Sequence, residues 1–305
     1  MELYWAGTNI TRHVNIRGCV HRDVSHGKCD CLELTLDHAA TWYRWGPEED
    51  DEIQVIQDGY DTGKLYLNTV IPEEDRYRVL ATSTKRAAAR RAWGSYRNVT
   101  LEQIINLCAA ECQMEGKLYG VDGRIRYPFL MRENEGGAAF LEKIGHWEGI
   151  AIKALNGAFR GIGIEYAQGR SPEMNITIRA DQRGVTYRRR DNTKYTHITV
   201  QTPWACATAR DTAAKGNNPK TVACLPAMDN AQAGRWARGL LLTHNREAEE
   251  IRLETTLNTR LSAMARVDVN GGTDMDGNWI VDEAEHDLYN KTSSVRLLRV
   301  IGTIQ

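Results

Sequence analysis

The chain has 305 residues, of which 42% are hydrophobic and 26% charged, an ordinary globular composition that is long enough for two or three domains. Its 39 lysines and arginines nearly balance 40 acidic residues, so a formal charge of −1 excludes overall electrostatic attraction for a polyanion such as nucleic acid. The absence of a long apolar run or a signal peptide, together with seven scattered cysteines, predicts a protein made in a reducing cytoplasm and not a membrane protein.

Residues 1–92 are expected to form a first, barrel-like β domain. The clearest strand signal is Cys31–Asp37, where Leu32, Leu34 and Leu36 alternate with polar residues. Asp58-Gly59 and Thr62-Gly63 have the composition of tight turns between short strands. The basic segment Lys85–Arg91 is interpreted as a solvated linker or short exposed helix, with nucleic-acid contact as a minor alternative.

Residues 93–172 change to a helical period and are expected to form an α/β insert domain. The spacing predicts a helix from Leu101 to Cys112 that begins with a capping box of Thr100 and Gln103 and ends near Gly116. A second helix is predicted over residues 135–147, ending before Gly149.

Asn156-Gly157 is the strongest hairpin signal in the chain. It lies between two predicted strands, Ile150–Leu155 and Ala158–Tyr166. The hairpin is expected to complete the insert.

Residues 173–305 are expected to form a second barrel-like β domain with one helix. Strands are predicted from Met174, Gly184 and Tyr195, followed by a polar loop at Asp211–Asn218. Asp229 with Gln232 can cap a helix, after which alternation resumes at residues 251–257, 279–281 and 295–300. The predicted fold class is therefore α+β and mainly β, with two small barrel-like domains flanking the insert.

Cysteines and histidines cluster near the N-terminus, which raises the question of a zinc site. The candidates are Cys19, His21, His26, Cys29 and Cys31. Only one residue separates the last two cysteines, whereas structural zinc sites commonly have two to four. The spacing therefore favours buried or surface thiols, and no metal or cofactor is predicted.

No catalytic motif is present in the sequence, and no catalytic residue is predicted. Asp274-Met275-Asp276-Gly277 resembles part of a calcium loop, but the glycine is misplaced relative to Glu285, so a turn is favoured. Glu48–Asp51 is interpreted as a solvated acidic loop, although paired carboxylates can hydrolyse glycans. Tyr187–Arg190 is interpreted as a strand end that faces solvent or an acidic protein neighbour.

Two stretches of sequence resemble phage tail hub proteins of the late control protein D group. The first is Trp93–Leu101 with the following helix, Phe140-Leu141, Trp147-Glu148-Gly149 and the Asn156-Gly157 hairpin. The second is Gly277–Val281, then His286-Asp287-Leu288 and the strand Ser294–Val300. Some relatives continue into a spike or wall-cleaving domain, whereas this chain ends soon after the last hairpin.

The resemblance implies a non-enzymatic baseplate hub of a phage tail or tail-like contractile injection particle, assembled in the host cytoplasm. Such a hub is a homotrimer that joins a sixfold tail tube to a threefold central spike. Its implied partners are the tube, spike and tape-measure proteins, with nucleic acid only passing through the channel. His286 would be an ordinary strand residue.

Two other functions remain open from the sequence. A tail-associated peptidoglycan hydrolase or peptidase could use carboxylates or Cys/His pairs that leave little linear signature. A carbohydrate-binding module is suggested only by the 8 tryptophans. Turnover of cell wall or binding of a glycan would distinguish these functions from a structural hub.

Overall fold

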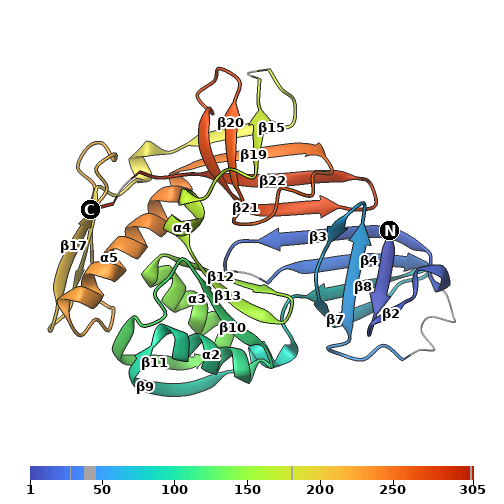
Figure 1. Ribbon diagram of the computed structural model, residues 1–305, viewed down its shortest axis with the longest axis horizontal. Helices are drawn as coiled ribbons and strands as arrows, with labels where there is room; N and C mark the ends of the chain where they lie inside the picture. The colour runs from blue at the N-terminus through green and yellow to red at the C-terminus, as the bar shows by residue number, and fades with distance from the viewer. Residues whose placement is uncertain (28, 38–45, 180, 303) are drawn as a thin grey trace.

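The computed structural model describes residues 1–305 except 28, 38–45, 180 and 303. Antiparallel strands dominate, and one 14-stranded sheet contains strands from both ends of the chain. Figure 1 shows the N-terminal strands on the right, the C-terminal strands above and the helical insert below. The predicted mainly β, α+β fold class is confirmed.

The first group of strands follows the predicted alternation. In β4, Leu32, Leu34 and Leu36 are buried while their neighbours are half-exposed. These leucines pack with strands β5 and β8 in a core of their own. The strands of this group are β1 (Glu2–Trp5), β2 (Thr8–Asn9), β3 (Ile16–Val24), β4 (Cys31–Asp37), β5 (Glu52–Gln57), β6 (Tyr60–Asp61), β7 (Leu65–Pro72) and β8 (Arg76–Thr82).

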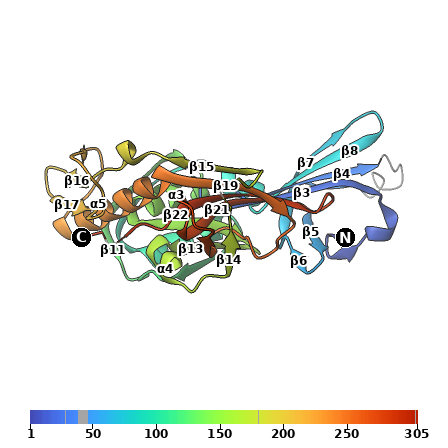
Figure 2. The same ribbon diagram turned by 90° about the horizontal axis from the view of Figure 1, so that it is seen from above.

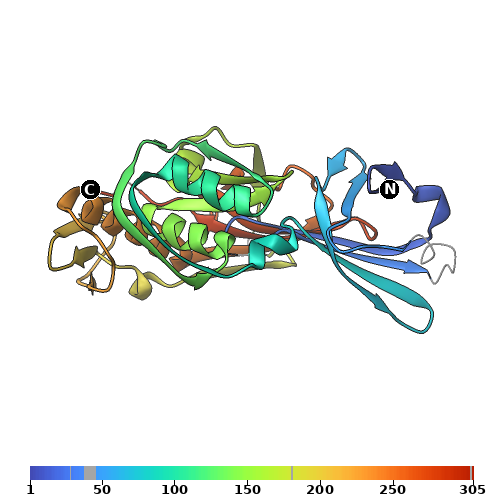
Figure 3. The same ribbon diagram turned by 90° about the horizontal axis from the view of Figure 1, so that it is seen from below.

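The insert begins with β9 (Ala92–Thr100), which pairs with β11 (Arg126–Glu135) in a long ribbon outside the helices α2 (Leu101–Glu111) and α3 (Gly137–Glu148). Figure 3 shows these two helices in green. The capping box of Thr100 and Gln103 is present as predicted. Gly116 does not end α2; it lies in β10 (Glu115–Tyr119), where a Cβ would clash with Asn106 of the helix.

The Asn156-Gly157 hairpin is confirmed. It joins β12 (Ile150–Leu155) to β13 (Ala158–Gly163), and both turn residues have positive φ. The second strand is shorter than predicted because the chain turns into α4 (Ile164–Gly169). The helix α3 ends at Gly149, which is left-handed as a C-terminal glycine commonly is.

The remaining chain builds a second group of strands and a small sheet beside α5. Asp229 caps α5 through the backbone N–H of Gln232, as predicted. The small sheet, formed by β16, β17 and β18, packs with α5 into the core of the insert. The elements are β14 (Met174–Thr177), β15 (Val185–Arg189), β16 (His197–Gln201), β17 (Cys206–Arg210), β18 (Pro219–Val222), α5 (Asn230–Asn245), β19 (Glu249–Thr256), β20 (Arg266–Asn270), β21 (Gly277–Asp287) and β22 (Thr292–Arg299).

The structure corrects the prediction of two separate barrels. Among the described residues, neither group of strands closes on itself, because β3 of the first group pairs with β21 of the second. The two groups nevertheless keep separate hydrophobic cores on the same sheet. They are therefore two β units fused edge to edge.

Candidate functional site

The two β units repeat the same strand order. In the first unit the strands lie in the order β3-β4-β8-β7-β5-β1, and in the second in the order β15-β19-β22-β21-β20-β14. Their order along the chain is also the same, so each strand has a counterpart in the other unit. One difference is that β1 is antiparallel to β5, whereas β14 is parallel to β20.

A β-bulge fixes the register of this repeat. In the first unit, β7 shifts register against β8 between Leu67 and Thr69. In the second, β21 shifts register against β22 between Val281 and Glu283. Because bulges are specific local features, their occurrence on counterpart strands equates Leu67 with Val281 and Thr69 with Glu283.

The counterpart positions share their burial as well as their pairing. The residues that pair with equivalent positions of β8 and β22 are themselves equivalent. By this pairing, Leu32 and Leu34 of β4 correspond to Ile251 and Leu253 of β19. All four side chains are buried in the core of their own unit. The repeat therefore extends to the apolar face, where the equated residues are identical in one pair, Leu34 and Leu253, and similar in the other, Leu32 and Ile251.

The two units meet where β3 pairs with β21. The pairing runs antiparallel from Val20 opposite Asp287 to Val24 opposite Glu283. Arg22 on β3 reaches two acids of β21, with Nε 3.2 Å from Glu283 and Nη2 2.5 Å from Glu285. The junction thus combines a backbone ladder with a cation facing two carboxylates, and its side chains are accessible enough for solvent to weaken these ion pairs.

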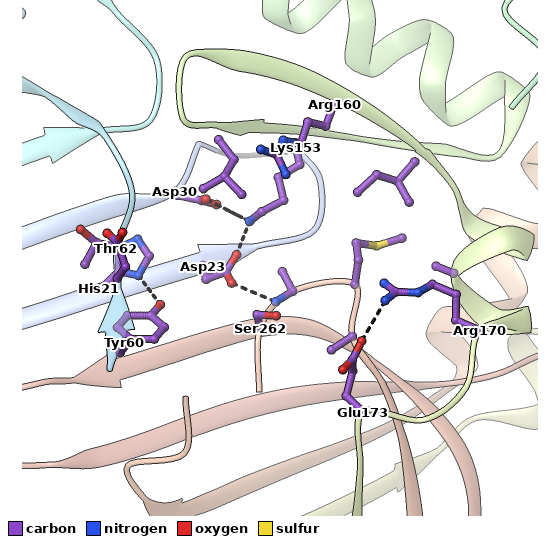
Figure 4. Close-up of a pocket in the computed structure, with 17 residues that line it drawn as sticks. His21, Asp23, Asp30, Tyr60, Thr62, Lys153, Arg160, Arg170, Glu173 and Ser262 are labelled. Atoms are coloured by element: carbon purple, nitrogen blue, oxygen red, sulfur yellow. Dashed lines mark hydrogen bonds and ion pairs between the residues drawn. The ribbon is translucent and has the colours of Figure 1, made fainter. Parts of the chain in front are cut away.

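A polar cavity of about 240 Å³ lies where the first unit, the insert hairpin and the segment before β20 meet. Lys153 of β12 extends between Asp23 of β3 and Asp30, which precedes β4 (Figure 4). Its Nζ is 2.9 Å from Asp30 and also contacts Asp23 and the carbonyl of Val24. These three charged side chains are almost completely buried, so the cluster ties the insert to the sheet.

Burial and the shared ammonium set the charge states of this cluster. Burial raises the pKa of Asp30 to about 6, against the attraction of Lys153. Burial alone would do the same to Asp23, but Lys153 outweighs it and holds the pKa of Asp23 below its usual value. Beside them, burial lowers the pKa of His21 to about 4, and its Nδ1 lies 2.7 Å from the hydroxyl of Tyr60.

The cysteines and histidines that lie close together in the N-terminal sequence are dispersed in the structure. Cys19 is buried in the core of the first unit, and His21 faces Tyr60. His26 instead contacts Ser25 and Arg246, while the thiol of Cys29 lies 3.1 Å from the hydroxyl of Thr84. Within the described ranges, no three metal-ligand side chains converge on one point.

The other sequence candidates occupy structural positions. Asp274–Asp276 lie in the turn between β20 and β21, where Asp276 accepts hydrogen bonds from the N–H groups of Gly272 and Thr273, and Gly277 begins β21. His286 is a buried strand residue, with Nδ1 2.8 Å from the hydroxyl of Ser293, and burial lowers its pKa. Asp51 of the acidic loop accepts a hydrogen bond from the indole N–H of Trp5.

The two basic candidates lie at the surface. Lys85–Arg91 contains a short 3₁₀ helix, Arg86–Ala89, as one of the two alternatives predicted. Tyr187–Arg189 form the end of β15, an edge strand that pairs with β19, and Arg190 follows directly after it. The tryptophans that suggested a carbohydrate-binding module include Trp42 and Trp45, which lie outside the described residues.

Among the described segments, no helix is long and apolar enough to cross a lipid bilayer.

Comparisons with known proteins give a clear structural result. No family model matches the sequence, and no curated protein matches it either. Solved structures match over nearly the whole chain, among them the 43 kDa tail protein of prophage MuSo2 from Shewanella oneidensis, with 9% identity, a TM-score of 0.70, and coverage of 98% of this chain and 97% of that one.

Two further structures extend the match. A tail protein from Neisseria meningitidis has 12% identity and a TM-score of 0.74, covering 98% of this chain and 95% of that one. An Escherichia coli component of the type VI secretion system, itself similar to tail proteins of bacteriophage T4, has 10% identity and a TM-score of 0.61, covering 99% and 77%. The chain therefore has the fold of phage tail proteins, and the predicted resemblance is confirmed at the level of the fold.

Proposed function

We propose that the protein is the structural baseplate hub of a phage tail or a tail-like contractile injection particle. The observation that carries the proposal is the internal repeat of two β units within a fold shared over full length with phage tail proteins. A pair of similar units in one chain lets three chains present six similar edges. Such a homotrimer would join a sixfold tail tube to a threefold spike.

The proposal assigns roles to the parts of the chain. The β units within residues 1–92 and 173–305 would build the ring, and the insert of residues 93–172, with the small sheet and α5 packed against it, would cover the outside of the ring. The partners would be the tube protein on one face, the spike protein on the other and the tape-measure protein in the channel, with nucleic acid only passing through. The particle would assemble in the cytoplasm of a bacterial host.

No catalytic step is part of this proposal. Asp23 and Asp30, the acids that converge in the cavity, both contact Lys153 and are shielded from solvent. Structural ion pairs shift pKa values as active sites do, so the raised pKa of Asp30 does not by itself indicate an enzyme. Hydrolysis of purified peptidoglycan by the wild-type chain, abolished in Asp30→Asn, would favour the tail-associated hydrolase instead.

The test of the hub function is the oligomeric state. Sedimentation of the purified chain, alone and with the spike protein of the same particle, is expected to show a trimer. A monomer at every concentration, even with the spike present, would contradict the proposal. Electron microscopy of the assembled particle should place the subunit on the tail axis, and a peripheral position would contradict it equally.

A further inference from the structure

Two strand edges of the large sheet lack partners among the described residues. On β7, the segment from Thr69 to Pro72 pairs with β8 on one side, because β5 reaches only Leu65 and Tyr66. At the other end of the same run of eight strands, β15 pairs with β19 alone. Figure 2 shows the hairpin of β7 and β8 extending away from the body of the molecule. Open edges of this kind expose backbone groups that readily pair with another strand.

Within the chain, the strands that correspond to these two open edges are paired with each other. By the repeat, β7 is the counterpart of β21, and β15 is the counterpart of β3. Inside the chain, β21 uses its first residues to pair with β20 and its later ones to pair with β3. The start of β7 pairs with β5 in the same way. The later part of β7, Thr69–Pro72, corresponds to the segment of β21 that pairs with β3, and it has no such partner among the described residues.

We propose that β7 of one copy of this chain pairs with β15 of a second copy, in the register that β21 and β3 use within the chain. Counting through the strand pairs equates Arg22 with Arg188 and Glu285 with Ile71. The intermolecular ladder then sets Ile71 opposite Arg188, Val70 opposite Arg189 and Thr69 opposite Arg190. This inference rests on the proposed self-assembling hub and adds the strands and the register to it.

The side chains at the two edges fit this arrangement. The β15 edge is basic, with Arg188 and Arg190 at positions that would face β7. The strand β7 supplies half-buried Val70 and Ile71, and the turn that follows it has the exposed acids Glu74 and Asp75, while Glu73 is paired with Arg76 in the same chain. Acidic and basic edges attract one another and repel a copy of themselves, which favours a directed contact over a symmetric one.

The contact is head-to-tail, because it joins two different edges. Repetition of such a contact either closes a ring or grows a filament. The sheet continues through β3 and β21 inside each copy and through β15 and β7 between copies. The junction between β units would then have the same strand pairing within a copy and between copies.

The first test strengthens the contact by copying the internal junction. Thr69 is exposed and corresponds to Glu283, the partner of Arg22. Thr69→Glu would place a carboxylate opposite Arg190 and diagonal to Arg188, as Glu283 is diagonal to Arg22 in the internal junction. The variant is expected to lower the dissociation constant for self-association by about two- to five-fold per contact at low salt. The matched variant Thr69→Lys is expected to raise it. Equal effects of the two charges, measured by sedimentation equilibrium, would overturn the inference.

The second test reads the register directly. In a background with the exposed Cys206 and Cys224 changed to serine, the double variants Val70→Cys with Arg189→Cys and Ile71→Cys with Arg188→Cys are oxidised. One of these neighbouring pairs should form a disulfide between chains, because adjacent antiparallel pairs alternate between wide and narrow spacing.

The control pair for the register is Val70→Cys with Tyr187→Cys, which would lie two residues out of register. It is expected to remain uncross-linked, since diagonal positions are about 7–8 Å apart. A trimer that cross-links only in the control pair, or in none, would overturn the inference and leave the hub function standing. A chain that is monomeric throughout, alone and with its spike, would overturn both.

Discussion

At the scale of single residues, Lys153 holds together three parts of the fold. Its ammonium group contacts Asp23 and Asp30 from two segments of the first unit, while its own strand belongs to the insert. A further contact from the backbone N–H of Ala263 to Asp23 connects the segment before β20. No local pattern in the sequence identifies such a cluster, because Lys153 is more than 100 residues away from both acids and shares no motif with them.

Lys153→Met is expected to destabilise the fold strongly. The side chain keeps its length, but Asp23 and Asp30 lose their counterion while remaining buried. Removing one member of a buried pair commonly costs about 3–5 kcal/mol. Urea unfolding followed by circular dichroism measures this loss.

The matched control is Lys64→Met, which removes an exposed ion pair with Glu52. That change should cost about 0–1 kcal/mol. Equal costs for the two lysines would show that the buried cluster does not stabilise the fold.

The charge state of Asp30 predicts a pH dependence. Its pKa is raised from 3.8 to about 6 in the folded chain, so it contributes stability that is fully present below pH 3.8 and is lost as pH rises through 6. His21 acts oppositely, since its pKa falls from 6.5 to about 4 and its stability contribution is lost as pH falls.

The variant Asp30→Asn removes the contribution of Asp30 and retains that of His21. The unfolding free energy of the wild type minus that of Asp30→Asn should therefore decline as pH rises, most steeply between about pH 4 and 6. Urea titrations across this range measure the difference. A difference that is constant with pH would contradict the charge states described for the cluster.

At the scale of elements, α5 packs against the end of α3 through a pair of glycines. A Cβ on Gly239 would lie 2.1 Å from the carbonyl oxygen of Trp147 and 2.5 Å from the nitrogen of Gly149. Because both of these neighbours are backbone atoms at a helix end, neither can move aside as a flexible side chain would. The close approach places the indole N–H of Trp236 2.8 Å from Glu148.

Gly239→Ala is expected to destabilise the fold by about 1–3 kcal/mol, because the added methyl group forces the two helices apart. The control in the same helix is Gly234→Ala, whose Cβ would meet nothing closer than 3.7 Å. That substitution should be neutral or stabilising by about 0.5–1 kcal/mol, since alanine favours a helix over glycine. The melting temperatures of the two variants should therefore differ, with that of Gly239→Ala the lower. Equal melting temperatures would contradict the close approach of α5 to the end of α3 at Gly239.

The elements that could be predicted from sequence are those with a complete local signal. The alternation of Cys31–Asp37, the capping box at Thr100 and the Asn156-Gly157 turn each specify their structure within a few residues. The ribbon of β9 and β11 was missed, since its strands pair across the whole of α2 and β10. The small sheet beside α5 was incompletely predicted, since β17 and β18 have weak apolar alternation.

At the scale of the whole molecule, the sequence indicated β-rich regions on both sides of the insert but not their fusion. Pairing between β3 and β21 joins residues more than 250 positions apart, and nothing in either strand specifies the other. The repeat was equally hidden, because its units share strand order, bulge position and burial but few residue identities. The basic strand end Tyr187–Arg190 could be singled out from the sequence, but Thr69–Pro72 has no distinguishing motif, so the proposed pairing of these edges depends on the structural equivalence of the two units.

The fusion of both units in one polypeptide also bears on how the ring would behave under mechanical load. The β3–β21 seam forms by folding of a single chain and is independent of protein concentration. In the proposed ring, contacts between copies would depend on protein concentration and would have no covalent connection. In a closed ring of three chains, the three β3–β21 pairings within chains would therefore resist pulling as parts of folded domains. The three β7–β15 pairings between chains would break first. The ring would then separate into whole subunits before any subunit unfolded.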